Sequence, residues 1–107
     1  MPAGLLFALA ILTEVAATLS LRMSDGFTRL VPSVIVVAGY AASFWLMALV
    51  LREYSAGFTY AVWSGSGTAI VAVFGILVWD ESAAALKLFS LALIVAGVIG
   101  LNLGSSQ

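Results

Sequence analysis

Four long apolar stretches, separated by short polar links, make up almost all of this 107-residue chain. A helix needs roughly 20 apolar residues to cross the hydrocarbon core of a bilayer, and charged residues interrupt this chain at about that spacing. The pattern predicts four membrane-spanning helices, at residues 4–21, 30–51, 57–79 and 84–103. The links are too short to hold a further domain. The expected fold is therefore all-α, a single transmembrane domain over residues 1–107 in which four antiparallel helices form a bundle.

Composition supports a membrane protein and removes several kinds of chemistry. Hydrophobic residues make up 64% of the chain and charged residues 8%, against about 25% charged residues in a typical soluble domain. The chain has no cysteine and no histidine, which excludes disulfides, thiolate catalysis and metal binding by either side chain. With a net charge of −1 and no basic run, nucleic acid is not an expected partner. We expect no metal, no cofactor and no enzymatic activity, and a first helix that is retained rather than cleaved as a signal peptide.

One carboxylate, Glu14, lies in the middle of the first apolar stretch, which has no other charge before Arg22. A charge at that depth costs roughly 2.5–3.5 kcal/mol on insertion scales, so an intramembrane carboxylate indicates a functional site. Glu14 is suited to binding a proton or a cationic ligand. Four helices alone would tend to expose it to lipid, which favours an oligomer with a shared interior. A monomer that shields Glu14 with its own second and third helices is the alternative.

Residues spaced three and four apart share one face of a helix, and such faces supply candidates to surround Glu14. The site-lining set is Phe7, Ala10, Ile11, Ala17 and Thr18 in the first span, Tyr40, Ser43 and Phe44 in the second, and Tyr60, Trp63 and Ser64 in the third. The aromatic rings among them present faces that attract cations. Ala10 and Ala17 leave room either for a ligand or for close approach of another helix.

Small residues in the last two spans indicate bending or packing. Gly65 and Gly67 weaken the third helix and allow a bend, or alternatively serve close packing. The fourth span has no ionisable residue after Lys87, and it carries a stripe that we assign to assembly: Ser90, Leu93, Ile94 and Gly97.

The charges in the loops give only a weak topology signal. Arg22, Arg29 and Lys87 lie on one side of the membrane and Arg52 lies on the other. The positive-inside rule places the first and third loops in the cytoplasm, but one or two charges can reverse that bias. Dual insertion of the same chain is therefore open.

Three stretches together resemble the small multidrug resistance family: residues 13–18 (TEVAAT), 26–33 (GFTRLVPS) and 60–67 (YAVWSGSG). The similarity extends over essentially the whole chain. It implies a multi-pass protein of the bacterial inner membrane that works as a homodimer, often of two oppositely inserted copies. It also implies proton-coupled export of hydrophobic organic cations.

The resemblance also implies residue roles. The family's essential carboxylate falls on Glu14, and its substrate-contacting aromatics fall on Tyr40, Tyr60 and Trp63. Its hinge glycines fall on Gly65 and Gly67, and its dimerising stripe falls on Ser90, Leu93, Ile94 and Gly97.

Two branches of the family fit different parts of the chain. Tyr40 is typical of the multidrug, quaternary-cation branch. Ala17 also speaks against the guanidinium-exporting branch, which tends to carry a tryptophan near the carboxylate. The run 90–95 looks more like the guanidinium branch. Because the first two spans face the site, we favour the multidrug branch. The alternatives are a guanidinium exporter, one subunit of a paired heterodimeric transporter, and a membrane subunit that does not transport.

Overall fold

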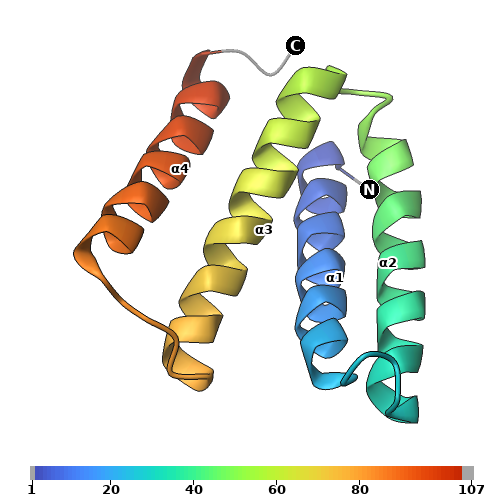
Figure 1. Ribbon diagram of the computed structural model, residues 1–107. Helices are drawn as coiled ribbons and strands as arrows, with labels where there is room; N and C mark the ends of the chain where they lie inside the picture. Colours follow the sequence, from blue (N-terminus) through green and yellow to red (C-terminus); the bar gives the residue numbers. More distant parts are fainter. Residues whose placement is uncertain (1, 105–107) are drawn as a thin grey trace. The chain divides into compact units, whose positions relative to one another are not determined.

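The computed structural model describes residues 2–104, and this part of the chain is helical with no strand (Figure 1). The helices are α1 (Ala3–Met23), α2 (Leu30–Val50), α3 (Ala56–Val78) and α4 (Ala85–Gly104). The four-helix, all-α prediction is confirmed, and each end lies within two residues of the expected limit. Each helix has 20 to 23 residues and contains an 18-residue window with a mean hydropathy of 1.9 to 2.1, so it is long and apolar enough to cross a membrane.

The chain divides into two compact units, one ending at Glu53 and the other beginning at Tyr54. The first unit is a hairpin in which α1 packs against α2, and the second is a hairpin in which α3 packs against α4. A single domain over residues 1–107 stays a prediction.

In the first hairpin, α1 and α2 approach closely through small residues. A Cβ atom added at Gly39 of α2 would lie 2.9 Å from the Cβ of Ala17 and 3.2 Å from the carbonyl oxygen of Thr13. Only glycine fits such a contact without a shift of the backbone. Packing through small residues is the usual way in which membrane helices associate, because lipid removes the hydrophobic drive between them.

The α1–α2 connection is tied to the end of α1 by Ser24, which is fully buried. The Ser24 hydroxyl donates to the Leu21 carbonyl oxygen at 2.7 Å and accepts from the Phe27 amide at 3.1 Å. Gly26 has a φ of +67°, a conformation that glycine adopts without strain. The connection is thus a compact turn that sends α2 back along α1.

In the second hairpin, α3 is a continuous helix through Gly65 and Gly67. A Cβ atom added at Gly65 would lie 2.8 Å from Cγ2 of Val98, so this glycine lies against α4. Near the end of α3, Gly75 lies under the Glu81 carboxylate, which pairs with Lys87 at 3.6 Å. In contrast to α3, α4 has no buried residue.

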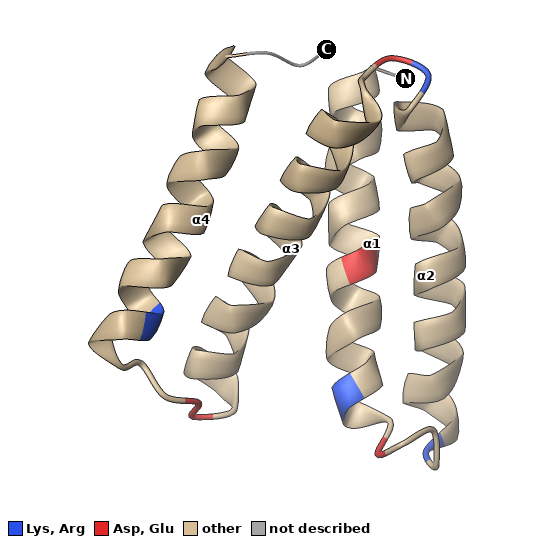
Figure 2. Ribbon diagram, turned by 45° about the horizontal axis from the view of Figure 1, so that its top comes forward, with Lys and Arg blue, Asp and Glu red and all other residues tan. Residues whose placement is uncertain are grey.

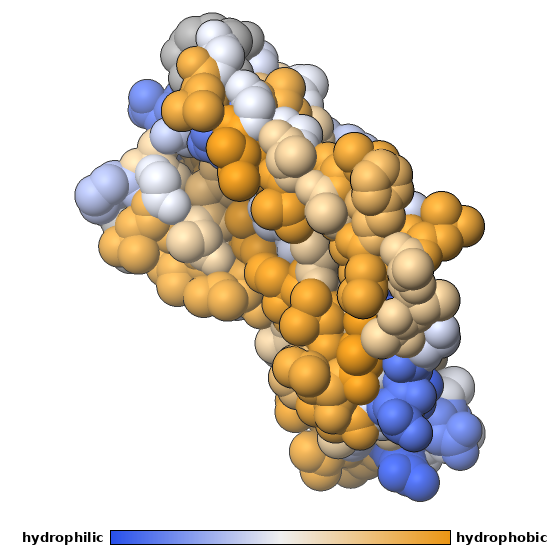
Figure 3. All heavy atoms as spheres, turned by 90° about the vertical axis from the view of Figure 1, so that its left-hand side faces the viewer, coloured by the Kyte–Doolittle hydropathy of each residue, from blue (hydrophilic) through white to orange (hydrophobic). Residues whose placement is uncertain are grey.

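The distribution of charge agrees with a membrane-spanning protein. Charged residues lie in the connections and near the helix ends, and the exception among the described residues is an acidic position midway along α1, which is Glu14 (Figure 2). On the face that presents α4, hydrophobic side chains predominate (Figure 3). Glu14 is therefore the group around which a site has to be built.

Candidate functional site

Glu14 is held by a hydroxyl one helical turn further along α1. Thr18 Oγ1 donates a hydrogen bond to Glu14 Oε1 at 2.8 Å. The two residues are four positions apart, a spacing that places side chains above one another on one face of a helix. Both side chains are half-buried.

The same threonine also binds Tyr40, which α2 contributes. Tyr40 Oη lies 2.7 Å from Thr18 Oγ1. A hydroxyl has one hydrogen to donate and two lone pairs that accept. Because the Thr18 hydrogen is directed to Glu14, Tyr40 is the donor in the second bond. The result is a chain of hydrogen bonds from Tyr40 through Thr18 to Glu14.

The second carboxylate oxygen of Glu14 has a different environment. Glu14 Oε2 is buried and has no hydrogen-bond partner among the described residues. A buried charged oxygen without a partner is unfavourable, because it has lost water and gained nothing in exchange. This oxygen is therefore the place where a proton or a cation would be stabilised.

Two contacts set the register of α2 against α1 around this chain. Next to Tyr40, Gly39 lies against Ala17, as described above. One turn along α2, the buried hydroxyl of Ser43 donates to the carbonyl oxygen of Ala10 at 2.8 Å. Ala10 and Ala17 are both fully buried, so within this hairpin the space beside these two residues is taken by α2.

The remaining predicted residues of the first hairpin surround this core. The rings of Tyr40 and Phe44 are stacked, with centroids 6.0 Å apart and planes inclined by 23°. Phe44 is 57% exposed, whereas Phe7 is buried and Ile11 is half-buried. The first hairpin thus brings Glu14, Thr18 and Tyr40 into direct contact and leaves the aromatic surface of Phe44 open.

In the second hairpin, the predicted aromatic residues form a pair. The rings of Tyr60 and Trp63 lie edge to face, with centroids 6.0 Å apart and planes inclined by 66°. Tyr60 is 67% exposed. The Ser64 hydroxyl donates to the Tyr60 carbonyl oxygen at 2.7 Å, a bond within α3. This pair presents an aromatic surface of the kind that attracts cations.

The residues predicted to bend or to assemble the protein are placed as follows. Gly65 contacts α4, and Gly67 is buried in α3. On α4, Ser90, Leu93 and Gly97 are exposed, whereas Ile94 lies near Gly65. The roles of these residues as hinge and dimer contacts stay predictions.

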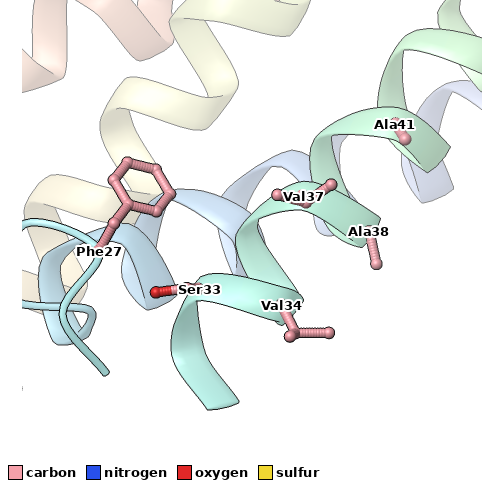
Figure 4. Close-up of a pocket in the computed structure, with 6 residues that line it drawn as sticks. All are labelled: Phe27, Ser33, Val34, Val37, Ala38 and Ala41. Carbon is pink, nitrogen blue, oxygen red and sulfur yellow. The ribbon is translucent and has the colours of Figure 1, made fainter. Parts of the chain in front are cut away.

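A hollow on α2 includes neither Glu14 nor the aromatic residues of the predicted site. It is lined by Phe27, Ser33, Val34, Val37, Ala38 and Ala41, which Figure 4 shows beside and along the first half of α2. Ser33 supplies the polar group of this lining, and its hydroxyl donates to the carbonyl oxygen of Arg29. The hollow has no charged group and includes none of the predicted site residues, so it is not a candidate for binding a proton or an ion.

Sequence reasoning missed two residues that position the site, Gly39 and Ser24. Gly39 precedes Tyr40 and lies three and four positions from Val36 and Ser43, both of which are buried. That spacing was a signal that Gly39 belongs to the face of α2 that packs on α1. Ser24 gave no comparable signal, because its burial depends on the path of the turn.

The chain is similar to a known family and to several known proteins. The model of the family described as Small Multidrug Resistance protein matches residues 4–94. A guanidinium exporter of Yersinia pseudotuberculosis is 43% identical to this chain over 96% of the chain and 99% of the relative. Multidrug resistance protein EbrA of Bacillus licheniformis is 42% identical over 96% and 99%. Quaternary ammonium compound-resistance protein QacE of Escherichia coli is 41% identical over 96% and 94%.

Proposed function

Since this chain belongs to the small multidrug resistance family and is a multi-pass membrane protein, we propose that it is a proton-coupled antiporter. Its proposed substrates are hydrophobic and quaternary cationic compounds, which it exports in exchange for protons. The names of its relatives support transport of cations out of the cell, because they include a guanidinium exporter and a quaternary ammonium compound-resistance protein.

The observation that carries the proposal is the environment of Glu14. It is the one carboxylate within a described helix, and its Oε1 is held by Thr18 while its Oε2 is buried without a partner. A carboxylate with one buried oxygen that has no partner favours whatever neutralises it. A proton and a lipophilic cation both do so, and each excludes the other from the same oxygen.

This competition is enough to couple the two fluxes. When a proton enters from the side where protons are abundant, it displaces the substrate, and when it leaves on the other side a new substrate binds. Protons moving inward down their gradient then drive substrate outward. In this mechanism the aromatic rings of Tyr40, Tyr60 and Trp63 contact the apolar body of the cation.

We propose further that the working form is a homodimer, in which α4 supplies the contact between copies and the two copies are oppositely inserted. The support is the fourth helix itself, which has no buried residue within the chain and yet carries small residues suited to helix association. A paired homologous subunit in place of the second copy is the variant of this proposal.

Guanidinium export is the second candidate. It is supported by the Yersinia pseudotuberculosis relative, whose identity of 43% is close to the 42% and 41% of the two multidrug-type relatives. Overall identity therefore does not choose between the two substrate classes. We favour the larger cations because of Tyr40, whose hydroxyl contacts Thr18 and whose ring is available to contact an apolar cation.

The test is substrate-evoked charge movement in proteoliposomes that contain the purified protein alone. We expect tetraphenylphosphonium to evoke currents whose size and sign vary with the proton gradient and that Glu14→Gln abolishes. Glu53→Gln, the same change in the exposed α2–α3 connection, is the matched control and should keep the currents.

Two other outcomes would change the proposal. Currents with guanidinium and none with tetraphenylphosphonium would establish the second candidate. Proton-coupled currents that persist in Glu14→Gln would contradict the mechanism for both substrate classes.

A further inference from the structure

The hydrogen-bond chain in the first hairpin ends on a group that changes its charge in the proposed transport cycle. We propose that Thr18 is a positioning residue whose hydroxyl couples the state of Glu14 to the hydrogen bonding of Tyr40. This inference rests on the proposed function, because it takes Glu14 as the group that alternates between proton and substrate. It adds a way in which the charge of the Glu14 carboxylate affects the orientation of the aromatic residues on α2.

The geometry gives the coupling its direction. With Glu14 ionised, Thr18 donates to Oε1 at 2.8 Å and is left with lone pairs, so Tyr40 donates to Thr18 at 2.7 Å. Hydrogen bonds to an ionised acceptor are roughly twice as strong as neutral ones, and bonds in a chain strengthen one another. The chain is therefore strongest in the state that is ready to receive a cation.

When Glu14 is neutralised, the hydrogen bonds no longer have to run from Tyr40 through Thr18 to Glu14. When a proton or a cation binds at Oε2, Oε1 becomes a weaker acceptor, and the Thr18 hydroxyl is able to rotate toward Tyr40 Oη. Tyr40 then accepts, and its own hydrogen is released from Thr18. Both steps are rotations of hydroxyl groups, in which every proton stays on its own oxygen.

Thr18 is the residue placed to do this, because the neighbouring hydroxyls point elsewhere. Thr13 Oγ1 donates to backbone carbonyls of its own helix, at 2.8 Å to Leu9 and 3.1 Å to Ala10. Ser43 donates to the carbonyl oxygen of Ala10. Within residues 2–104, the side-chain donor to the Glu14 carboxylate is thus Thr18.

The Tyr40 end of the chain leads to the surface that a cation would contact. The Tyr40 ring is stacked with that of Phe44, so the tyrosine is held through its hydroxyl by Thr18 and through its ring by Phe44. A change at the hydroxyl therefore alters how firmly this aromatic pair is oriented. In this way Thr18 acts on the substrate through Tyr40 without having to touch it.

The primary test is a difference infrared spectrum of the reconstituted protein, recorded as tetraphenylphosphonium binds. Wild type should show a tyrosine band that Tyr40→Phe removes and a carboxylate band that Glu14→Gln removes. Thr18→Val keeps the shape of the side chain but lacks the hydroxyl, and we expect it to lose the tyrosine band and keep the carboxylate band. Thr18→Ser should restore the tyrosine band.

Thr13→Val is the matched control, since it makes the same change on the same helix at a hydroxyl that does not contact Glu14. It should keep both bands. Thr18→Ala is a second variant without the hydroxyl, for use if the valine variant does not fold. A tyrosine band that persists in folded Thr18→Val or Thr18→Ala would overturn the proposal.

A double-mutant cycle provides an independent readout. One hydrogen bond in such a chain corresponds to about a two- to tenfold change in apparent affinity for tetraphenylphosphonium, and this is the effect expected of Tyr40→Phe in wild type. In the Thr18→Val background, Tyr40→Phe should change the affinity by less than about twofold, because the bond it removes is already absent. Equal effects in the two backgrounds would show that the Tyr40 hydroxyl acts directly.

These experiments separate the inference from the function on which it rests. If Glu14→Gln still exchanges protons for substrate, the proposed function fails and the coupling fails with it. If Glu14→Gln is inactive while Thr18→Val keeps the tyrosine band, the function stands and the role of Thr18 alone is wrong.

Discussion

At the scale of single residues, three hydroxyls around Glu14 bind three different kinds of acceptor. Thr18 binds the carboxylate, Thr13 binds the backbone of its own helix, and Ser43 joins α2 to α1. All three residue types can donate in any of these ways, and the outcome depends on which acceptor lies within about 3 Å. The role of a hydroxyl in a membrane helix therefore depends on its acceptor and does not follow from its position in the sequence.

The role of Ser43 leads to a prediction about stability. Ser43→Ala removes a buried bond between helices, and such bonds contribute about 0.6 kcal/mol on average and ~1.7 kcal/mol at most in membrane proteins. We expect a decrease of that size in the free energy of unfolding, measured in mixed micelles. Ser33→Ala is the control, because the Ser33 hydroxyl bonds to the carbonyl oxygen of Arg29 at the start of its own helix and not to a second helix. Equal effects of the two substitutions would contradict the assignment.

At the scale of the elements, two glycines decide how closely the helices of each hairpin approach. Gly39 accepts Ala17 of α1, and Gly65 accepts Val98 of α4. At either position a Cβ atom would come closer to its neighbour than atoms in well-packed proteins do, so the helices or, at Gly65, the Val98 side chain would have to shift. The contacts beside Glu14 depend directly on the first of these approaches.

Gly39→Ala should therefore weaken the first hairpin although alanine favours helix. Overpacking costs about 1–3 kcal/mol, more than the ~1 kcal/mol that alanine gains in helix propensity. We expect less stable protein and weaker tetraphenylphosphonium binding, because α2 carries Tyr40 away from Thr18. Gly57→Ala is the control, since nothing lies within 4 Å of its added Cβ. If Gly39→Ala is as stable and active as Gly57→Ala, the close approach is not required.

Gly65→Ala separates the two roles considered for that glycine. The added Cβ would lie 2.8 Å from Val98 Cγ2, and we expect Gly65→Ala to destabilise the second hairpin. Val98→Ala in the same chain removes the obstructing methyl group and should restore the free energy of unfolding. Transport measured on the restored double variant then reports on bending: full activity assigns Gly65 to packing alone, and low activity indicates that α3 has to bend there.

At the scale of the whole molecule, α4 is the helix that no other part of the single chain buries. It contains an 18-residue window with a mean hydropathy of 2.1, it has no buried residue, and the space around Gly97 is open. A helix of this kind is compatible with lipid on every side, but its small residues permit another helix to approach. This is the physical basis for expecting a dimer through α4.

Gly97→Trp tests the assembly without disturbing the fold of the chain. Because nothing lies within 4 Å of a Cβ at Gly97, this position is open in a single copy, and we expect the larger side chain to obstruct a second one. We expect a shift from dimer to monomer, measured by counting photobleaching steps in dilute bilayers, and loss of transport. Val95→Trp lies nearly opposite on α4, and it should leave the dimer intact. Dimers that persist in Gly97→Trp would place the contact elsewhere.

Much of the architecture was predictable, because the physical rules involved are local. Length and hydropathy gave the four helices, since an apolar run of about 20 residues has few alternatives in a bilayer. The single carboxylate in such a run identified Glu14, and helical spacing put Thr18 on the same face. By the same rule Gly39 belonged with Ser43, but the smaller side chain gave no chemical reason to include it.

By itself, then, the sequence determined that this is a four-helix membrane protein of the small multidrug resistance family with one intramembrane carboxylate. Only the tertiary structure decided that Tyr40 bonds to Thr18 and that Glu14 Oε2 is left without a partner. The reason is that periodicity relates residues within one helix, whereas the register between helices comes from the close approach of Gly39 and Ala17 and from the bond between Ser43 and Ala10. A shift of one residue in that register would have turned Tyr40 by about 100° around the axis of α2, away from Thr18.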